Sequence, residues 1–200
     1  MTLRLRPLAA AALLALPLLA AAAERVVVLR TVEDARFPAD PATCAAAPFQ
    51  PVNVVLGAGA WTIRTGTWSG VMRDDAVRFA GPVTGCGLLT TTAPFTAQPF
   101  LIRFDLPDGT YVATGTCTIT SNDVPQRGLL LLGCTLKLTS FPPGVVGGSA
   151  TSASVFNLAQ LPGFDTGSIW TLRIHDDRPA PAGEDDGDDH DHHDDHHHGR

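Results

Sequence analysis

The chain has 200 residues, of which 44% are apolar, and its formal net charge is −6. This apolar share is ordinary for a globular protein and excludes a chain that is disordered throughout. The chain has one lysine and three glutamates but 19 glycines and 16 prolines, which excludes a helical protein and indicates frequent turns.

The N-terminal 23 residues have the three parts of a secretory signal peptide. Arg4 and Arg6 precede a run of leucines and alanines, 8–23, which ends in three alanines directly before a charged residue. This run is shorter than the roughly 20 apolar residues of a membrane-spanning helix. We therefore predict a signal peptide over 1–23 and a secreted or periplasmic protein without a stable membrane anchor after cleavage. Arg outnumbers Lys thirteen to one, a bias that favours a GC-rich bacterial source.

Residues 24–177 contain short β-rich runs separated by turn residues, and we predict that they form a single all-β domain. Apart from two longer runs between 109 and 140, the strand candidates are 25–32, 52–56, 60–65, 67–73, 76–80, 87–92, 100–104, 145–156 and 167–175. About ten short antiparallel strands are typical of a sandwich or a barrel, and the pattern does not decide between these two architectures.

The two longer runs form a predicted hairpin around a turn that contains Asn122, Asp123 and Pro125. Because side chains alternate between the faces of a strand, Cys117 and Cys134 both fall on the apolar faces of their runs. They stand equally far from the turn, so we expect them opposite one another. Cβ atoms in such positions are roughly 4.5–5.5 Å apart, near the reach of a disulfide.

All four cysteines follow the predicted signal peptide. An even number in an oxidising compartment predicts two disulfides. The hairpin pairs Cys117 with Cys134, which leaves Cys44 to pair with Cys86. The alternative is a thiolate metal site, but the chain lacks the C-x-x-C spacing that such sites commonly use.

The three tryptophans are candidates either for core packing or for a platform that stacks on sugar rings. Trp170 alternates with Leu172 and Ile174, which places it in the inward-facing set of the last strand. Trp61 also stands in a core-like pattern, and core packing is the favoured interpretation. Trp61 and Trp68 are kept as candidate ligand-facing residues.

His175 is the single histidine before the C-terminal tail and is a candidate catalytic residue. No serine stands in a G-x-S-x-G turn, and a lone histidine at a strand end is usually solvated. Asp74, Asp75, Asp105 and Asp108 could supply paired carboxylates for sugar hydrolysis. Each of them stands in or beside a predicted connection, where aspartate caps the backbone. We expect a protein that is not an enzyme.

The C-terminal segment differs from the rest of the chain. Residues 178–182, an arginine followed by alternating proline and alanine, form a predicted linker. Residues 183–200 contain no apolar side chain, which predicts a disordered tail. The tail holds eight carboxylates and six histidines, a mixture that suits Cu(II), Ni(II) and Zn(II). The candidate ligands are His190, His192, His193, His196, His197, His198, Asp191, Asp194 and Asp195.

Two functions follow as hypotheses. The first is an exported, non-enzymatic β-domain whose tail binds or buffers the divalent metals Zn, Ni or Cu. The alternative is a ligand-binding or structural module of the envelope or extracellular space, for a glycan, lipid or protein, with a tail that only solubilises. The acidic tail would repel nucleic acid, so no nucleic-acid partner is expected.

Overall fold

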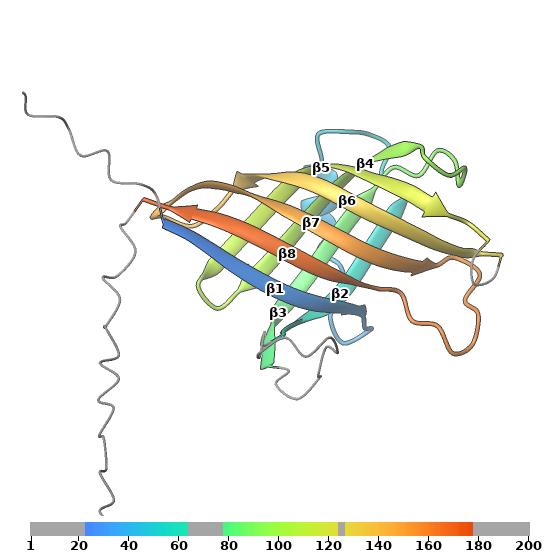
Figure 1. The fold of residues 1–200 in the computed structure, drawn as a ribbon, viewed down its shortest axis with the longest axis horizontal. Helices are drawn as coiled ribbons and strands as arrows, with labels where there is room; N and C mark the ends of the chain where they lie inside the picture. The colour runs from blue at the N-terminus through green and yellow to red at the C-terminus, as the bar shows by residue number, and fades with distance from the viewer. Residues whose placement is uncertain (1–22, 64–77, 124–126, 178–200) are drawn as a thin grey trace, which may run out of the picture.

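The strands form one closed antiparallel barrel in which each strand pairs with its neighbours in the sequence and the last pairs with the first (Figure 1). The computed structural model describes residues 23–63, 78–123 and 127–177. The strands are β1 (Ala23–Glu33), β2 (Val54–Thr62), β3 (Arg78–Gly87), β4 (Ala97–Leu106), β5 (Gly109–Ser121), β6 (Leu129–Ser140), β7 (Val145–Asn157) and β8 (Gly167–Asp176). The all-β prediction is confirmed, and the architecture is a barrel.

Eight strands stand in the described residues, so the prediction of about ten strands is wrong. The predicted strands 52–56 and 60–65 are one strand, β2, which continues through Gly57 and Gly59. A side chain at Gly57 would collide with the backbone of Phe37 and Ala39. The glycine that resembles a turn residue in the sequence therefore allows the preceding connection to lie directly on the strand.

A second break in the pattern is also continuous strand. The predicted strand 76–80 runs on through Gly81 and Pro82 as β3, where Gly81 has a φ of 147° and the register to β2 shifts between Ala60 and Trp61. The predicted strand 87–92 has no counterpart beyond the last residue of β3, because the chain turns there towards β4. The predicted strand 67–73 lies outside the described residues.

Large apolar side chains fill the barrel interior. Of the predicted inward set on β8, Trp170 is 2% exposed, and Leu172 and Ile174 are fully buried, which confirms the alternation. They pack in one cluster with residues from all the other strands, among them Leu29, Ala60, Val83, Phe104, Tyr111, Leu136 and Ala150.

The connection between β1 and β2 packs on the outside of the barrel. It contains a short helix, α1 (Pro41–Ala45), which begins at Asp40, whose carboxylate accepts a hydrogen bond from the Ala42 N–H at 3.0 Å. Arg103 of β4 donates to the same carboxylate at 2.9 Å, and Cys44 of α1 forms a disulfide with Cys86 of β3. These contacts fix the connection against β3 and β4.

The second disulfide joins Cys117 and Cys134 inside the barrel, where they are direct partners of β5 and β6 with a Cα–Cα distance of 3.9 Å. The two bridges have the pairing that the hairpin geometry predicts. Two disulfides are typical of proteins that fold in an oxidising compartment. Within the described ranges no helix is long and apolar enough to cross a membrane.

Candidate ligand-binding site

The two ends of the barrel differ in chemistry. At one end β1 begins, β8 ends and a tight turn joins β4 to β5; this end is called the polar end. At the other end β1 ends and β8 begins; this is called the apolar end. The described termini, Ala23 and Asp177, both lie at the polar end (Figure 1), since Ala23 pairs with Asp176.

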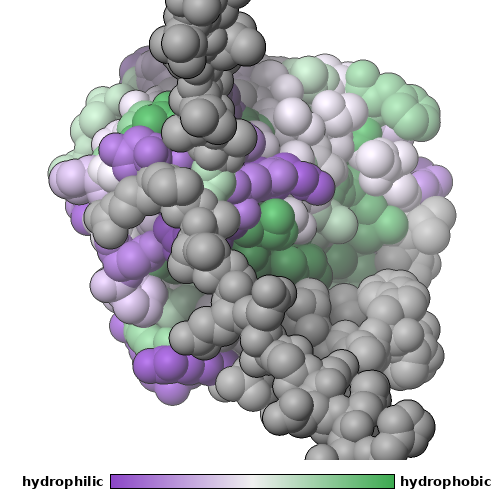
Figure 2. Space-filling view, turned by 60° about the vertical axis from the view of Figure 1, so that its left-hand side comes forward, coloured by the Kyte–Doolittle hydropathy of each residue, from purple (hydrophilic) through white to green (hydrophobic). Residues whose placement is uncertain are grey.

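The polar end is closed by a group of charged and phenolic side chains. Arg25 donates to the Asp108 carboxylate at 2.7 Å and to the Tyr111 hydroxyl at 2.9 Å, and that hydroxyl donates to Asp108 at 2.8 Å. The Asp176 carboxylate is 3.6 Å from Nε of Arg25. Figure 2, turned to bring this side forward, shows hydrophilic residues over much of the surface beside a smaller hydrophobic area.

The phenol at this end is held in its protonated form. Burial of Tyr111 raises its pKa above the usual value, and the hydrogen bond that its hydroxyl donates to Asp108 adds to the increase, while Arg25 opposes it. Burial disfavours the phenolate because the charged form loses its hydration. The neutral hydroxyl therefore remains a donor to Asp108.

An aromatic layer separates the polar end from the apolar end. The Trp170 ring stacks on Phe100 at a centroid distance of 6.5 Å and meets Phe104 edge-on at 5.5 Å. Gly85 and Gly87 of β3 make room for this layer, since a Cβ at these positions would lie 3.0 and 3.2 Å from the Phe100 ring. Phe100 is the ring of this layer that lines the space beyond it, and Trp170 and Phe104 support it from below; the layer is called the aromatic floor.

Beyond this floor the barrel holds a recess of about 80 Å³ at the apolar end. Its apolar walls come from β2, β4, β5, β6 and β7. Among its lining residues in the described ranges there is no Asp, Glu, Lys, Arg or His. The main apolar contributors are Val54, Leu56, Phe100, Ile119, Leu130 and Phe156.

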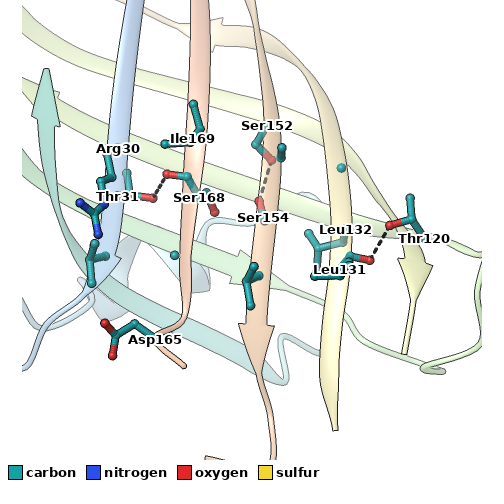
Figure 3. A pocket seen from close by; sticks show the side chains of 15 residues that line it. Arg30, Thr31, Thr120, Leu131, Leu132, Ser152, Ser154, Asp165, Ser168 and Ile169 are labelled. Atoms are coloured by element: carbon teal, nitrogen blue, oxygen red, sulfur yellow. Dashed lines mark hydrogen bonds between the residues drawn. The ribbon is translucent and has the colours of Figure 1, made fainter. Parts of the chain in front are cut away.

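Two residues with hydroxyl groups, Ser154 and Ser168, line one wall of the recess, and Thr31 and Ser152 lie beside them. The inner positions Leu132, Ser154, Ser168 and Thr31 are successive register partners across β6, β7, β8 and β1. Figure 3 shows Thr31, Ser168 and Ser154 on adjacent strands. The Ser154 and Ser152 hydroxyls are 2.9 Å apart and hydrogen bonded, and Thr31 donates to the Ser168 carbonyl at 3.5 Å. This row of small polar side chains is called the hydroxyl wall.

Thr166 and Gln98 are the other polar residues of the recess. The Thr166 hydroxyl accepts a hydrogen bond from the Asn157 N–H at 3.1 Å. The Gln98 amide is also used within the protein. Its side-chain oxygen accepts bonds from the N–H and the hydroxyl of Thr90, each at 3.0 Å, and its nitrogen donates to the Thr91 carbonyl at 3.4 Å. Gln98 therefore anchors the loop between β3 and β4, and the hydroxyl wall is the polar surface of the recess that faces an incoming molecule.

A wider, shallower groove of about 560 Å³ lies where the same strands meet solvent (Figure 3). Alternation places Arg30, Leu131, Ala153 and Ile169 on the outer face, next to the inward-facing residues of the hydroxyl wall. Its lining mixes small residues such as Gly133 and Gly167 with larger ones, and it is more open than the recess. It encloses an apolar molecule less well than the recess does.

The structure places the tryptophan candidates differently. Trp170 is in the core, as predicted, but Trp61 is on the outer face of β2, so its predicted core packing is wrong. It forms an aromatic cluster with Phe37 and Phe79 at centroid distances of 6.5 and 5.9 Å. The reason is that Ala60, its neighbour in the strand, takes the inward position and is fully buried. Trp68 lies outside the described residues.

The catalytic candidates in the described ranges do not share partners. Asp105 bonds Arg103 and Thr110, whereas Asp108 belongs to the polar end. His175 is exposed near the end of β8. Asp74, Asp75 and the candidate metal ligands of the tail lie outside the described residues. In the part of the chain that the structure does describe, no group of three or more His, Cys, Asp or Glu residues is placed to hold a metal.

Comparisons with protein-family models, with curated proteins and with solved structures find no match to this chain. Sequence reasoning missed the recess because its lining residues come from almost every strand. One signal was present: Ser152 and Ser154 on β7 and Ser168 on β8 occupy the inward-facing positions of their strands, where the neighbouring inward residues are apolar.

Proposed function

We propose that this protein is an exported, non-enzymatic binding protein whose barrel takes up a small apolar molecule at its apolar end. The observation that carries this proposal is a recess with apolar walls, a fixed aromatic floor and no charged lining residue among those described. Ligand sites are typically concave, mostly apolar and already formed before binding. An eight-stranded barrel is just wide enough to be filled by side chains or to hold one small ligand.

The size of the recess limits the ligand. A water molecule needs roughly 10–15 Å³ of such space, so the recess of about 80 Å³ holds a group of about five to eight non-hydrogen atoms. A single aromatic ring or a short branched chain has this size. A larger molecule could place one end in the recess and leave the rest outside.

Toluene is the probe for this proposal. Addition of toluene to the mature protein should shift the NMR signals of the Leu56 and Ile119 methyl groups and should raise the melting temperature. The variant Ser154→Phe fills the recess and should abolish both effects. Its matched control is Ala153→Phe, the adjacent residue on the outer face of β7, which should leave toluene binding intact.

The control also separates the recess from the outer groove. Loss of binding in Ala153→Phe with retained binding in Ser154→Phe would place the ligand in the groove and contradict the proposal. Circular dichroism of both variants shows whether the barrel has formed. Leu56→Phe offers a second, smaller obstruction of the recess if Ser154→Phe does not fold.

A second function is proposed for the C-terminal tail, which we infer binds or buffers Zn(II), Ni(II) or Cu(II). The supporting observation is its six histidines among eight carboxylates in eighteen residues. Several ligand sets along such a segment are interchangeable, so sites of modest affinity are expected. Neutral imidazole is the ligand, and binding should therefore weaken below about pH 6.

Calorimetric titration of the full mature chain with Ni(II) tests the tail. Replacement of its six histidines by glutamine should lower the number of bound ions, because the imidazole ligands are lost. His175→Gln on β8 is the matched control and should leave the stoichiometry unchanged. Equal stoichiometry in the native chain and the six-histidine variant would refute metal binding by the tail.

Secretion or a periplasmic location is part of the same proposal. It is supported by the charged, apolar and alanine-rich parts of residues 1–23 and by the two disulfides. The apolar end then faces an extracytoplasmic space, from which the ligand is taken.

A further inference from the structure

We propose that the ligand of the recess is uncharged and carries one hydroxyl or carbonyl group, which it directs to the hydroxyl wall. This inference rests on the proposed uptake of an apolar molecule and specifies its chemical class. Ser154 and Ser168 meet the polar group, and the aromatic floor and the walls from β2 and β5 meet the apolar body.

The recess offers no partner to a charged ligand group. An ion moved out of water needs an opposite charge or several hydrogen bonds, and an unpaired ion is strongly disfavoured in an apolar site. The described lining of the recess supplies no charged side chain. The charged groups Arg25, Asp108 and Asp176 stand at the polar end, beyond the layer of Phe104 and Trp170. Carboxylates and ammonium ions are therefore excluded from the recess.

The hydroxyl wall offers both donors and acceptors of hydrogen bonds. In the pair Ser152 and Ser154, one hydroxyl donates to the other, and the accepting hydroxyl keeps a hydrogen of its own. Ser168 brings a further hydroxyl to the same wall, one strand away. Hydroxyls both donate and accept, so the wall suits an alcohol as well as a ketone or an aldehyde. Val54, Leu56 and Ile119 contribute no side-chain polar atom to the lining, and the Gln98 amide is already engaged with Thr90 and Thr91.

The hydroxyl wall and the aromatic floor occupy neighbouring rows of inward-facing residues. Ser154 is register partner to Leu132 on one side and Ser168 on the other, whereas the next inward row is Cys134, Ser152 and Trp170. The hydroxyl wall thus stands one row above the aromatic floor. A ring laid on Phe100 would carry a substituent of one or two atoms to the level of Ser154. The geometry fits an aromatic or branched alcohol.

Four molecules of similar size test this assignment: toluene, benzyl alcohol, benzoate and benzylammonium, each titrated at pH 7.5 against the full mature chain by NMR. Benzyl alcohol should bind most tightly, and benzoate and benzylammonium should bind at least about 10-fold more weakly, because each brings an unpaired charge. Ser154→Ala with Ser168→Ala should weaken benzyl alcohol by about 2- to 12-fold, the range for one hydrogen bond, and should leave toluene unchanged.

Ser149→Ala is the matched control, since Ser149 belongs to the same strand but to the outward-facing set. It should alter none of the four affinities. Toluene binding without preference for benzyl alcohol, or benzoate binding equal to that of the alcohol, would overturn this inference and leave the proposed function standing. Absence of binding by all four molecules would overturn both.

Discussion

The inward-facing side chains at the two ends of the barrel differ in chemistry: they are charged or phenolic at one end and apolar or hydroxyl-bearing at the other. Every barrel leaves inward-facing side chains at its ends, where the interior meets water. At the polar end these positions hold Arg25, Tyr111 and Asp176, which with Asp108 close the interior by hydrogen bonds and ion pairs. At the apolar end they hold serine and aliphatic residues that cannot close it in this way. A cavity can therefore arise at the end of a barrel where no charged or hydrogen-bonding side chains close the interior, without a dedicated binding loop.

The largest effect is expected where the two ends meet. Trp170→Ala removes the ring that packs between Phe100 and Phe104, and the loss should lower the free energy of unfolding by about 3–5 kcal/mol. It should also deepen the recess, so that naphthalene binds. Urea denaturation and NMR titration measure the two effects. Trp61→Ala, on the outer face, should lower the free energy of unfolding by less and leave ligand binding unchanged. An equal loss of stability in the two variants would show that Trp170 is not the structural floor.

Loss of the inner disulfide should have the next largest effect on stability. It should also change ligand binding, because Cys117 lines the recess. Replacing both Cys117 and Cys134 by alanine frees a loop with a sequence separation of 17, for which chain entropy predicts a loss of about 3 kcal/mol. The outer bridge, with a separation of 42, should cost about 4 kcal/mol by the same reasoning. Toluene affinity separates them: only the inner pair should change it. Unchanged affinity in the inner variant would exclude Cys117 from the ligand wall.

A smaller effect is expected from Tyr111→Phe at the polar end. The substitution keeps the buried ring and removes the hydroxyl that joins Arg25 to Asp108, so it should cost about 1–2 kcal/mol. Thermal denaturation measures this cost. Toluene binding at the other end should stay the same, and a large change in toluene affinity would contradict the separation of the two ends by the aromatic layer.

The smallest expected effect is a loss of stability at alkaline pH. The pKa of Tyr111 is raised in the folded protein, so the native state holds its proton more tightly than the unfolded chain does. Its contribution to stability is complete below the unfolded pKa of about 10 and is lost as pH rises through the folded value. Tyr111 is the only tyrosine in the chain, so absorbance of tyrosinate follows it directly. Ionisation at the ordinary pH without unfolding would refute a buried phenol.

Alternation in single strands made part of this structure predictable. It located the hairpin of β5 and β6, the pairing of Cys117 with Cys134 and the inward set that contains Trp170. It failed at Gly57 and Gly81, because a glycine that permits close approach within a strand resembles one that forms a turn. Alternation also did not predict the face of β2 on which Trp61 lies, since the burial of Ala60 depends on the curvature of the closed sheet.

The recess was less predictable than the fold, for a physical reason. The lining residues are unremarkable in their own strands: Ser154 and Ser168, for example, resemble surface hydroxyls. Their roles come from the order of strands around the barrel, which brings Ser154, Ser168 and Thr31 into one row. Strand order and register are tertiary information that no local pattern contains.

The pairing of β1 with β8 has a consequence for the way the protein is made. Thr31 and Ser168 are register partners, yet nearly the whole domain lies between them in the sequence. During synthesis the first seven strands can form a curved sheet, but both of its edges stay unpaired until β8 arrives. Unpaired edges invite association with other chains. Assembly therefore ends with the contact most distant in the sequence, and the growing chain needs protection until that strand is complete.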